Sequence, residues 1–276
     1  MIIMEREDFL SRRIRELANT SYQRGIGTFS DFLTLSEQDL LYRLSPLKNF
    51  GVYTFLWGGY EQAERCMAGF WPASDIDLRE GRENLSFDDH GICRSDPAAA
   101  GLSLPACWVM IEASAPKFAQ KLSHRDYLGS VLGLGLERSV IGDILAQEHS
   151  AFVFCDEKIA SFLIRELSQV SRTNVSVREA GPELLPQAKK ELMTGTVASV
   201  RLDSLVAFAL SISRSEAAAQ IEGGHAYVNG RLIQSVSFVP KEGDAISVRH
   251  KGKFLFSEEK GKTKKGRCSI AVEKFV

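Results

Sequence analysis

The sequence predicts an α+β protein with an N-terminal helical segment, an α/β middle domain with helices on a small sheet, and a C-terminal module of two short helices on a hairpin sheet. Two patterns predict this class. Apolar residues recur at helical spacing near both ends of the chain, and between them short β-rich runs alternate with helical stretches. The 276 residues, 44% of them hydrophobic, suffice for two or three small cores. We place the domains at 1–47, 48–180 and 196–276, with a linker at 181–195.

The N-terminal segment contains two predicted helices. The first spans residues 5–19, in which four apolar side chains recur at helical spacing: Phe9, Leu10, Ile14 and Leu17. Gly25 and Gly27 then interrupt the pattern. A second helix is expected to begin near Ser36, a residue type suited to a helix N-terminus, and to stop before Pro46.

The middle domain is predicted from alternating strands and helices. β-rich runs give strand candidates at 52–57, 107–111, 151–155 and 174–177, and helix candidates lie at 60–65, 124–134 and 157–168. Residues 79–104 show little periodicity, so we expect a long loop or insertion there.

Charge is divided unevenly along the chain. The net charge is −1, but residues 196–276 hold thirteen basic and eight acidic side chains, a net +5 that leaves −6 for residues 1–195. This asymmetry is expected when one part of a protein carries most of the attraction to phosphates. No run approaches the length of a membrane-spanning helix, and the acidic start is unlike a signal peptide. We therefore expect a cytoplasmic protein without membrane insertion.

Cysteines and histidines are too scattered for a metal site. The five cysteines form no Cys-x-x-Cys pair, and neither they nor the five histidines fall at the spacings of structural zinc ligands. The odd number of cysteines also disfavours a complete disulfide framework. We expect neither a metal nor a cofactor.

The C-terminal module combines short helices with a tight hairpin. Residues 201–210 give one apolar helical face, and Ser213 with Glu216 predicts a capping box that opens a second helix. Residues 225–230 predict a strand that ends in Asn229-Gly230, the strongest short hairpin signal, and 245–249 a further strand.

Six of these signatures together resemble the RNA-binding domain named after ribosomal small-subunit protein four, here called the S-four domain. They are Arg-Leu-Asp at 201–203, Ser-Arg-Ser at 213–215, Gly-Gly-His at 223–225, Val-Asn-Gly at 228–230, Gly-Asp at 243–244 and Ser-Val-Arg at 247–249. The resemblance covers about residues 200–250. It implies that the start of the second helix and the following hairpin face RNA, which selects Ser213, Arg214, Ser215, His225, Asn229 and Arg231.

Elementary electrostatics supports the start of the second helix. Helix N-termini accept phosphates, and Arg214 adds a full charge with forked donors. Helix capping by Ser213 and turn formation by Asn229 remain structural alternatives.

A basic hairpin is predicted at residues 260–267, before a final strand at 268–272. It lacks the Gly-x4-Gly-Lys-Ser/Thr order of a phosphate loop, so we interpret it as a hairpin that follows a phosphate backbone. We expect the hairpin lysines to share one RNA-binding surface with Arg214, Asn229 and Arg231. The basic residues that complete this prediction are Arg201, Lys251, Lys253, Lys262, Lys264, Lys265 and Arg267.

Two upstream stretches, 50–65 and 124–144, resemble the YlmH-type family, in which an N-terminal α/β region precedes an S-four domain. Residues 79–104 depart from the more compact connection of that family. The resemblance implies a non-enzymatic protein that binds structured RNA (rRNA and tRNA). Its implied target is the large ribosomal subunit holding peptidyl-tRNA during quality control of stalled translation, with a further link to cell division.

The middle domain offers four weaker RNA-binding candidates. Tyr60 could stack on RNA, Arg65 could neutralise it, and Arg125 at a helix start could meet a phosphate with help from His124. Packing and helix capping explain these residues equally well.

RNA-modifying enzymes that carry an S-four domain are the main alternative. A pseudouridine synthase would use the aspartate of Arg-Leu-Asp, but the motif at 201–203 begins the S-four helix and lacks the following Thr-Ser-Gly. An RNA methyltransferase would need a glycine loop between a strand and a helix, whereas Gly133-Leu-Gly135 ends a helix. A tyrosyl-tRNA synthetase fragment would show the two nucleotide-binding signatures of such synthetases. Neither signature is present in this sequence. We therefore expect no enzymatic activity.

Overall fold

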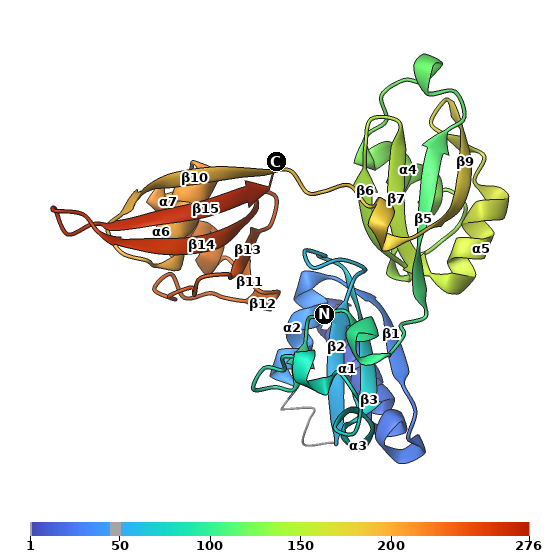
Figure 1. Ribbon diagram of the computed structural model, residues 1–276, viewed down its shortest axis with the longest axis horizontal. Coiled ribbons are helices and arrows are strands. Elements are labelled where there is room, and N and C mark those ends of the chain that lie inside the picture. Colours follow the sequence, from blue (N-terminus) through green and yellow to red (C-terminus); the bar gives the residue numbers. More distant parts are fainter. Residues whose placement is uncertain (1, 45–50, 276) are drawn as a thin grey trace. The chain divides into compact units, whose positions relative to one another are not determined.

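The computed structural model describes residues 2–44 and 51–275, and it divides into two compact units, residues 1–186 and 187–276. Figure 1 shows the helices and strands of each unit. Three sequence predictions fall outside the described residues: the boundary between residues 47 and 48, the end of the second helix before Pro46, and the start of the first family-like stretch at Phe50.

The N-terminal part of the first unit is a helix-and-sheet structure, so the prediction of a purely helical segment is wrong. Its helices are α1 (Ile2–Arg24), α2 (Leu35–Arg43) and the short α3 (Ala73–Ile76), and its strands are β1 (Thr28–Leu33), β2 (Val52–Trp57), β3 (Cys66–Pro72) and β4 (Ile92–Cys93). The sheet order is β1-β3-β2-β4. Polar Ser30 and Asp31 obscure β1 in the sequence, and the strand exists because it pairs antiparallel with the fully buried β3.

Two local predictions in this part are corrected. Helix α2 begins one residue after Thr34, whose side chain forms a reciprocal capping box with Glu37, so Thr34 and not Ser36 is the cap. Residues 60–65 form turns rather than a helix, because Asp143 accepts hydrogen bonds from the backbone amides of Glu64 and Arg65.

The rest of the first unit is a five-stranded sheet with two helices on one face. Its elements are β5 (Ala106–Ala113), α4 (His124–Leu132), β6 (Ile141–Ala146), β7 (Ser150–Asp156), α5 (Glu157–Glu166), β8 (Gln169–Val170) and β9 (Thr173–Ala180), in the sheet order β6-β7-β5-β9-β8. The predicted strands near 107–111, 151–155 and 174–177 are confirmed, as are the helices near 124–134 and 157–168.

The two sheets of the first unit share an aromatic core. Phe32 and Phe55 from the first sheet and Trp108 and Phe154 from the second are buried in one cluster. The rings of Phe32 and Phe154 pack edge to face with centroids 5.6 Å apart. Residues 79–104 are mainly irregular, as predicted, but three of their leucines are buried in this same cluster: Leu85, Leu102 and Leu104.

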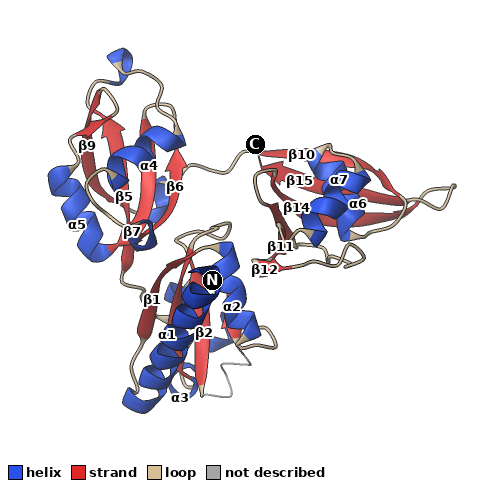
Figure 2. Cartoon of the chain, turned by 180° about the vertical axis from the view of Figure 1, so that it is seen from behind, coloured by secondary structure: helices blue, strands red, loops and turns tan. Residues whose placement is uncertain are grey.

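The second unit is an antiparallel sheet covered on one face by two helices (Figure 2). Its elements are β10 (Lys190–Val197), α6 (Leu202–Leu210), α7 (Arg214–Glu222), β11 (Ala226–Val228), β12 (Arg231–Leu232), β13 (Ala245–Val248), β14 (Gly252–Lys262) and β15 (Cys268–Phe275). The strand order is β10-β15-β14-β13-β11-β12. Residues 190–195, part of the predicted linker, belong to β10, because they pair along their whole length with the end of the chain in β15.

The turns of this unit follow the sequence signals. Asn229 and Gly230 have φ values of 49° and 78°, the left-handed pair that a tight type I′ hairpin needs, so the predicted hairpin is confirmed. Ser213 caps α7 by accepting a hydrogen bond from the Glu216 amide at 3.1 Å. The Glu216 carboxylate, predicted to bond back to the cap, accepts a hydrogen bond from Lys251 at 2.6 Å.

Candidate RNA-binding surface

A buried carboxylate organises the start of α7. Asp203, whose side chain is 8% exposed, accepts a hydrogen bond from Nη2 of Arg214 at 2.6 Å. Its second oxygen lies 3.5 Å from Nε of Arg201. Both arginine side chains remain accessible, at 55% and 39% exposure. Asp203 therefore holds the Arg214 guanidinium by a hydrogen bond and lies within ion-pair distance of Arg201, while both arginine side chains stay partly exposed to meet an anion.

Lys251 extends this arrangement from the turn between β13 and β14. Its ammonium lies 2.6 Å from the carboxylate of Glu216, in the first turn of α7. Arg201, Arg214 and Lys251 thus surround the helix start, and we call these three residues the α7 cluster. The partial positive charge of the helix start lies among the three cations, an arrangement suited to a phosphate.

The two serines predicted with Arg214 lie at the same helix start. The hydroxyls of Ser213 and Ser215 are 2.9 Å apart, and Ser213 also caps the helix. The capping role predicted as an alternative for Ser213 is therefore present, while Ser215 is exposed beside it.

The hairpin turn uses its asparagine internally. Nδ2 of Asn229 donates to Asp244 at 2.7 Å, and Oδ1 of Asn229 accepts from the Ala245 amide at 2.9 Å. These bonds favour the structural alternative for Asn229. Arg231, two residues further on, is exposed.

His225 and Lys253 are partly buried in the module. The His225 carbonyl accepts from the Arg249 amide at 2.9 Å. The Lys253 ammonium lies 5.6 Å from the centre of the Phe275 ring. Packing and sheet formation therefore account for part of what both residues do.

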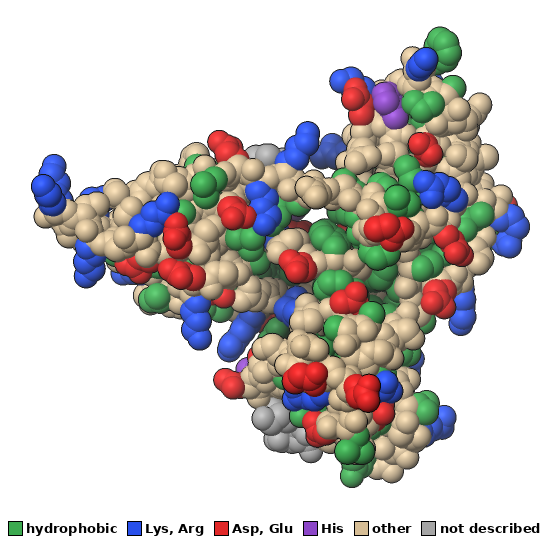
Figure 3. Space-filling view, in the orientation of Figure 1, with side chains coloured by type: hydrophobic (Ala, Val, Ile, Leu, Met, Phe, Trp, Pro, Cys, Tyr) green, Lys and Arg blue, Asp and Glu red, His purple; other side chains and the backbone are tan. Residues whose placement is uncertain are grey.

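The β14–β15 hairpin presents its lysines at an exposed tip. Lys262, Lys264 and Lys265 are exposed, and Figure 3 shows basic side chains gathered at this end of the unit. Arg267 is used differently, because its guanidinium donates to the hydroxyl and the carbonyl of Thr196 at 3.0 and 2.7 Å. It fastens the hairpin to β10, whereas Lys262, Lys264 and Lys265 stay exposed at the tip.

The basic residues do not form one compact patch. Lys251 precedes β14 and Lys262 ends it, so the two lie at opposite ends of a strand of 11 residues. At about 3.3 Å per residue that strand is roughly 35 Å long. The module therefore offers separate contact points, in contrast to the single surface expected from the sequence.

Tyr60 and Arg65 join the two sheets of the first unit. The Tyr60 hydroxyl donates to Asp143 at 2.9 Å, and burial together with the Asp143 charge raises the pKa of this phenol. The Arg65 guanidinium donates to the carbonyls of Phe32, Arg138 and Ile141 at 2.9, 3.1 and 3.0 Å. These contacts favour packing over RNA contact. Sequence reasoning missed Asp143, because a lone aspartate in a strand gives no signal of its distant partners.

His124 and Arg125 occupy the first turn of α4. Ser123 and Asp126 form the reciprocal cap of this helix, and both His124 and Arg125 are exposed. Partial burial and the nearby Arg138 charge lower the pKa of His124. Arg125 keeps its position at an exposed helix start, as the sequence predicted.

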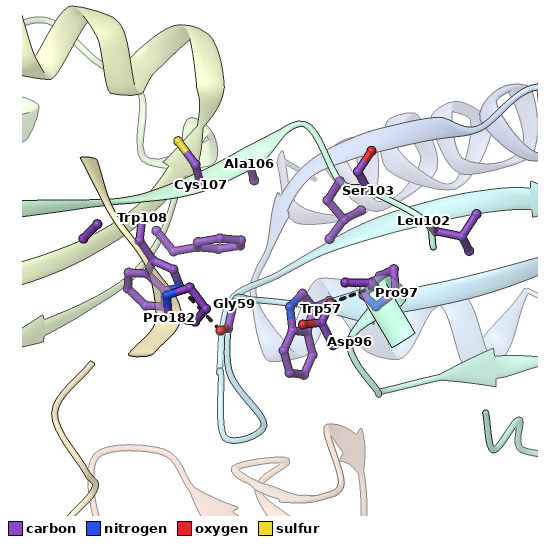
Figure 4. Close-up of a pocket in the computed structure, with 14 residues that line it drawn as sticks. Trp57, Gly59, Asp96, Pro97, Leu102, Ser103, Ala106, Cys107, Trp108 and Pro182 are labelled. Carbon is purple, nitrogen blue, oxygen red and sulfur yellow. Dashed lines mark hydrogen bonds between the residues drawn. The ribbon is translucent and has the colours of Figure 1, made fainter. Parts of the chain in front are cut away.

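A cavity of about 300 Å³ lies where the two sheets of the first unit meet (Figure 4). Aromatic side chains from both sheets, Trp57, Trp108 and Phe154, line it. The Trp108 indole donates to the Gly59 carbonyl at 3.4 Å. A Cβ on Gly59, at φ 89°, would stand 2.8 Å from that indole, so the close approach requires glycine. Asp96 also lines the cavity, and no described lining residue is Lys or Arg, so its chemistry does not suit a phosphate.

Residues 2–44 and 51–275 contain neither a cluster of metal-ligating side chains nor a membrane-spanning helix. No group of three or more His, Cys, Asp or Glu side chains within these ranges could hold a metal ion. Within the same ranges, no helix is long and apolar enough to cross a membrane.

Comparison with known proteins identifies two domains in the chain. Residues 108–183 match a family model described as "Putative RNA-binding domain in YlmH", and residues 200–246 match the model described as "S4 domain", the S-four domain of the sequence prediction. An α+β unit followed by a basic S-four module defines a class of RNA-binding protein. With both models matched in this order, the chain contains a YlmH-type RNA-binding domain followed by an S-four domain.

The chain is similar to a curated protein and to a protein of solved structure. The chain is 28% identical over 247 residues to "Ribosome-associated protein quality control protein P2" of Bacillus subtilis, covering 89% of this chain and 86% of that protein. A solved structure titled "Cell division protein ylmH from Streptococcus pneumoniae" has 18% sequence identity and a TM-score of 0.43, covering 63% of this chain and 87% of that one.

Proposed function

We propose that this protein binds the large ribosomal subunit through ribosomal RNA and tRNA and acts, without catalysis, in the quality control of stalled translation. The observation that carries the proposal is the α7 cluster, in which Asp203 holds Arg201 and Arg214 at a helix start inside a matched S-four domain. The curated relative, whose name places it in ribosome-associated quality control, supports the choice of the ribosome as the partner.

The chemistry of the α7 cluster suits a folded RNA backbone. A phosphate at the start of α7 would accept from backbone amides and from the forked donors of Arg214. Lys251 would add a second charge from the neighbouring turn. Such contacts position a protein on RNA but do not read its sequence, so the shape of the ribosomal site would provide the specificity.

The hairpin tip supplies a second contact. Lys262, Lys264 and Lys265 are exposed at the far end of β14. Because the tip and Lys251 are separated along this strand, the module would span two stretches of backbone. A structured RNA offers such paired stretches, whereas a short single strand does not.

An RNA-modifying enzyme is disfavoured by the position of Asp203. In a pseudouridine synthase the aspartate of Arg-Leu-Asp would have to reach a base, but here it is buried and bonded to Arg214. Its geometry fits the positioning of arginines. We therefore propose that the protein acts by binding, as the sequence predicted.

Co-sedimentation with purified large ribosomal subunits tests the proposal. Arg214→Ala removes a charge-assisted contact and is expected to weaken binding about tenfold. Arg165→Ala is the matched control, because Arg165 is 67% exposed on α5 of the first unit, outside the S-four module. Equal binding by wild type and Arg214→Ala, or no binding by wild type, would refute the proposal.

A further inference from the structure

The loop between β5 and α4, residues 114–123, exposes an aromatic ring. The Phe118 side chain is 92% exposed, the highest value among the large hydrophobic residues that the structure describes. Single exposed apolar residues are common on protein surfaces, but an almost fully exposed phenylalanine at a loop tip is a candidate contact point.

The loop holds this ring outward by a defined turn. Pro116 starts a short 3-10 turn in which the amides of Phe118 and Ala119 donate to Ala115 and Pro116 at 3.0 and 3.3 Å. Further along, the Leu122 amide donates to the Glu148 carbonyl at 3.0 Å. The exposed position of Phe118 therefore belongs to an ordered loop with few degrees of freedom left to lose on binding.

Two other turns lie beside the loop. The Gln120 side chain donates to the Ser171 hydroxyl at 3.1 Å, which joins the loop to the β8–β9 turn. The bond from Leu122 to Glu148 joins it to the β6–β7 turn. Arg172 follows Ser171, and it is exposed like Lys117 beside Phe118.

The loop and the two turns beside it carry a net positive charge, whereas the first unit as a whole is acidic. Residues 1–186 carry a net −7, whereas the three neighbouring segments 114–126, 147–149 and 171–172 carry four basic and two acidic side chains, a net +2. Lys121 is committed to Glu148 at 2.6 Å. In Figure 1 the loop lies at the top of the view, and in Figure 3 hydrophobic and basic side chains occur together at that end.

We propose that this loop is a second RNA contact, in which Phe118 stacks on an unpaired base while Lys117 and Arg172 meet the flanking phosphates. An aromatic ring among cations is the usual chemistry of single-stranded RNA recognition, since every base offers a π face and every nucleotide a phosphate. The segment lies within the matched residues 108–183. This inference rests on the proposed RNA-binding function and deepens it by naming a site outside the S-four module.

The test uses the full chain and two probes. The first is a fluorescein-labelled oligoadenylate of about twelve nucleotides, single-stranded or annealed to its complement. The second is purified large ribosomal subunits. Phe118→Ala removes the ring, Phe118→Tyr keeps it, and Leu78→Ala is the matched control because Leu78 is 87% exposed elsewhere in the same unit. Equal melting temperatures verify that each variant is folded.

We expect Phe118→Ala to weaken binding of the single-stranded probe at least about fivefold, whereas Phe118→Tyr stays within about twofold of wild type. Lys117→Ala and Arg172→Ala are expected to weaken it and to reduce its salt dependence. Lys158→Ala, an exposed lysine in the first turn of α5, is the charge control. The oligoadenylate annealed to its complement should bind more weakly, and its affinity should be the same for wild type and Phe118→Ala.

Oligoadenylate binding that does not change in Phe118→Ala overturns the inference, whatever the ribosomal subunits do. Phe118-dependent binding to phosphatidylglycerol vesicles, without binding to RNA, also overturns it and assigns the loop to a membrane surface. If the oligonucleotide binds through Phe118 but ribosomal subunits are not bound, the loop site stands and the proposed ribosomal function fails. The two failures are thus distinguishable.

Discussion

Asp203 and Arg214 form an ion pair of 2.6 Å between the first turn of α6 and the first residue of α7. The carboxylate is almost buried and the guanidinium is half exposed, so the pair is anchored on one side and open on the other. Under the proposed function, Asp203 would position Arg214 for RNA binding, and a substitution at Asp203 can separate positioning from simple charge attraction.

The first prediction tests whether Asp203 acts by positioning the arginines or only through its charge. Asp203→Asn raises the net charge by one, so charge attraction alone would strengthen RNA binding. We expect about tenfold weaker binding instead, because Arg214 and Arg201 lose their common anchor. Glu222→Gln makes the same charge change at an exposed position and serves as the control. Filter binding to ribosomal RNA at fixed salt measures both variants, and tighter binding by Asp203→Asn would disprove the positioning role.

The hairpin tip should govern salt dependence. Lys264→Ala with Lys265→Ala is expected to lower the slope of log affinity against log salt by about 0.7 to 0.9 for each phosphate that the variant no longer neutralises. Titrations at several salt concentrations measure the slope. An unchanged slope would mean that the tip does not touch RNA. The matched double variant Arg178→Ala with Lys158→Ala, on exposed positions of the first unit, should leave the slope unchanged.

Asp143 should matter for stability rather than for RNA contact. It accepts hydrogen bonds from the Tyr60 hydroxyl and from the amides of Glu64 and Arg65 at 2.9, 2.7 and 3.1 Å. Asp143→Ala leaves these donors without their acceptor, so we expect a loss of about 3 kcal/mol in the free energy of unfolding. Urea denaturation of this variant and of Asp89→Ala, an exposed control, measures the loss. A change below about 1 kcal/mol would show that the junction tolerates the substitution.

Tyr127 should make the fold sensitive to alkaline pH. It is fully buried, its hydroxyl has no hydrogen-bond partner among the described residues, and burial raises its pKa to about 12. Below the unfolded value near 10 the phenol is protonated in both states. Between pH 10 and 12 only the unfolded chain ionises, so stability falls as pH rises through this window.

Tyr127→Phe removes both the titration and the unsatisfied hydroxyl. We expect it to change stability at neutral pH by no more than about 1 kcal/mol and to flatten the decline above pH 10. Tyr22→Phe, at an exposed tyrosine, is the control. Identical alkaline transitions in wild type and Tyr127→Phe would rule out this residue as their source.

The sequence predicts most strongly where local signals decide the structure. Asn229-Gly230 determines a hairpin by backbone conformation alone, and Ser213 marks a helix start by its side chain, so both were predictable. The strand β1 was not, because its Ser30 and Asp31 interrupt the apolar pattern and its pairing with β3 joins residues about forty apart in the sequence.

In the candidate site, too, local sequence signals predict some features, whereas others depend on residues distant in the sequence. The position of Arg214 at a helix start follows from sequence, but its partner Asp203 lies in another helix, and the pairing of Lys251 with Glu216 depends on how a turn approaches that helix. The separation of the hairpin lysines from Lys251 follows from the length of β14 and its position in the sheet. The number of charged residues in the sequence could not predict the distance between the hairpin lysines and Lys251.

A cryo-electron microscopy structure of the full chain on large ribosomal subunits that hold peptidyl-tRNA tests the central claim most directly. We predict that a phosphate of ribosomal RNA or tRNA lies about 3 Å from the Arg214 guanidinium at the start of α7, with Asp203 still holding that side chain from behind. A bound chain whose α7 start faces solvent, with no RNA near Arg214, would contradict it.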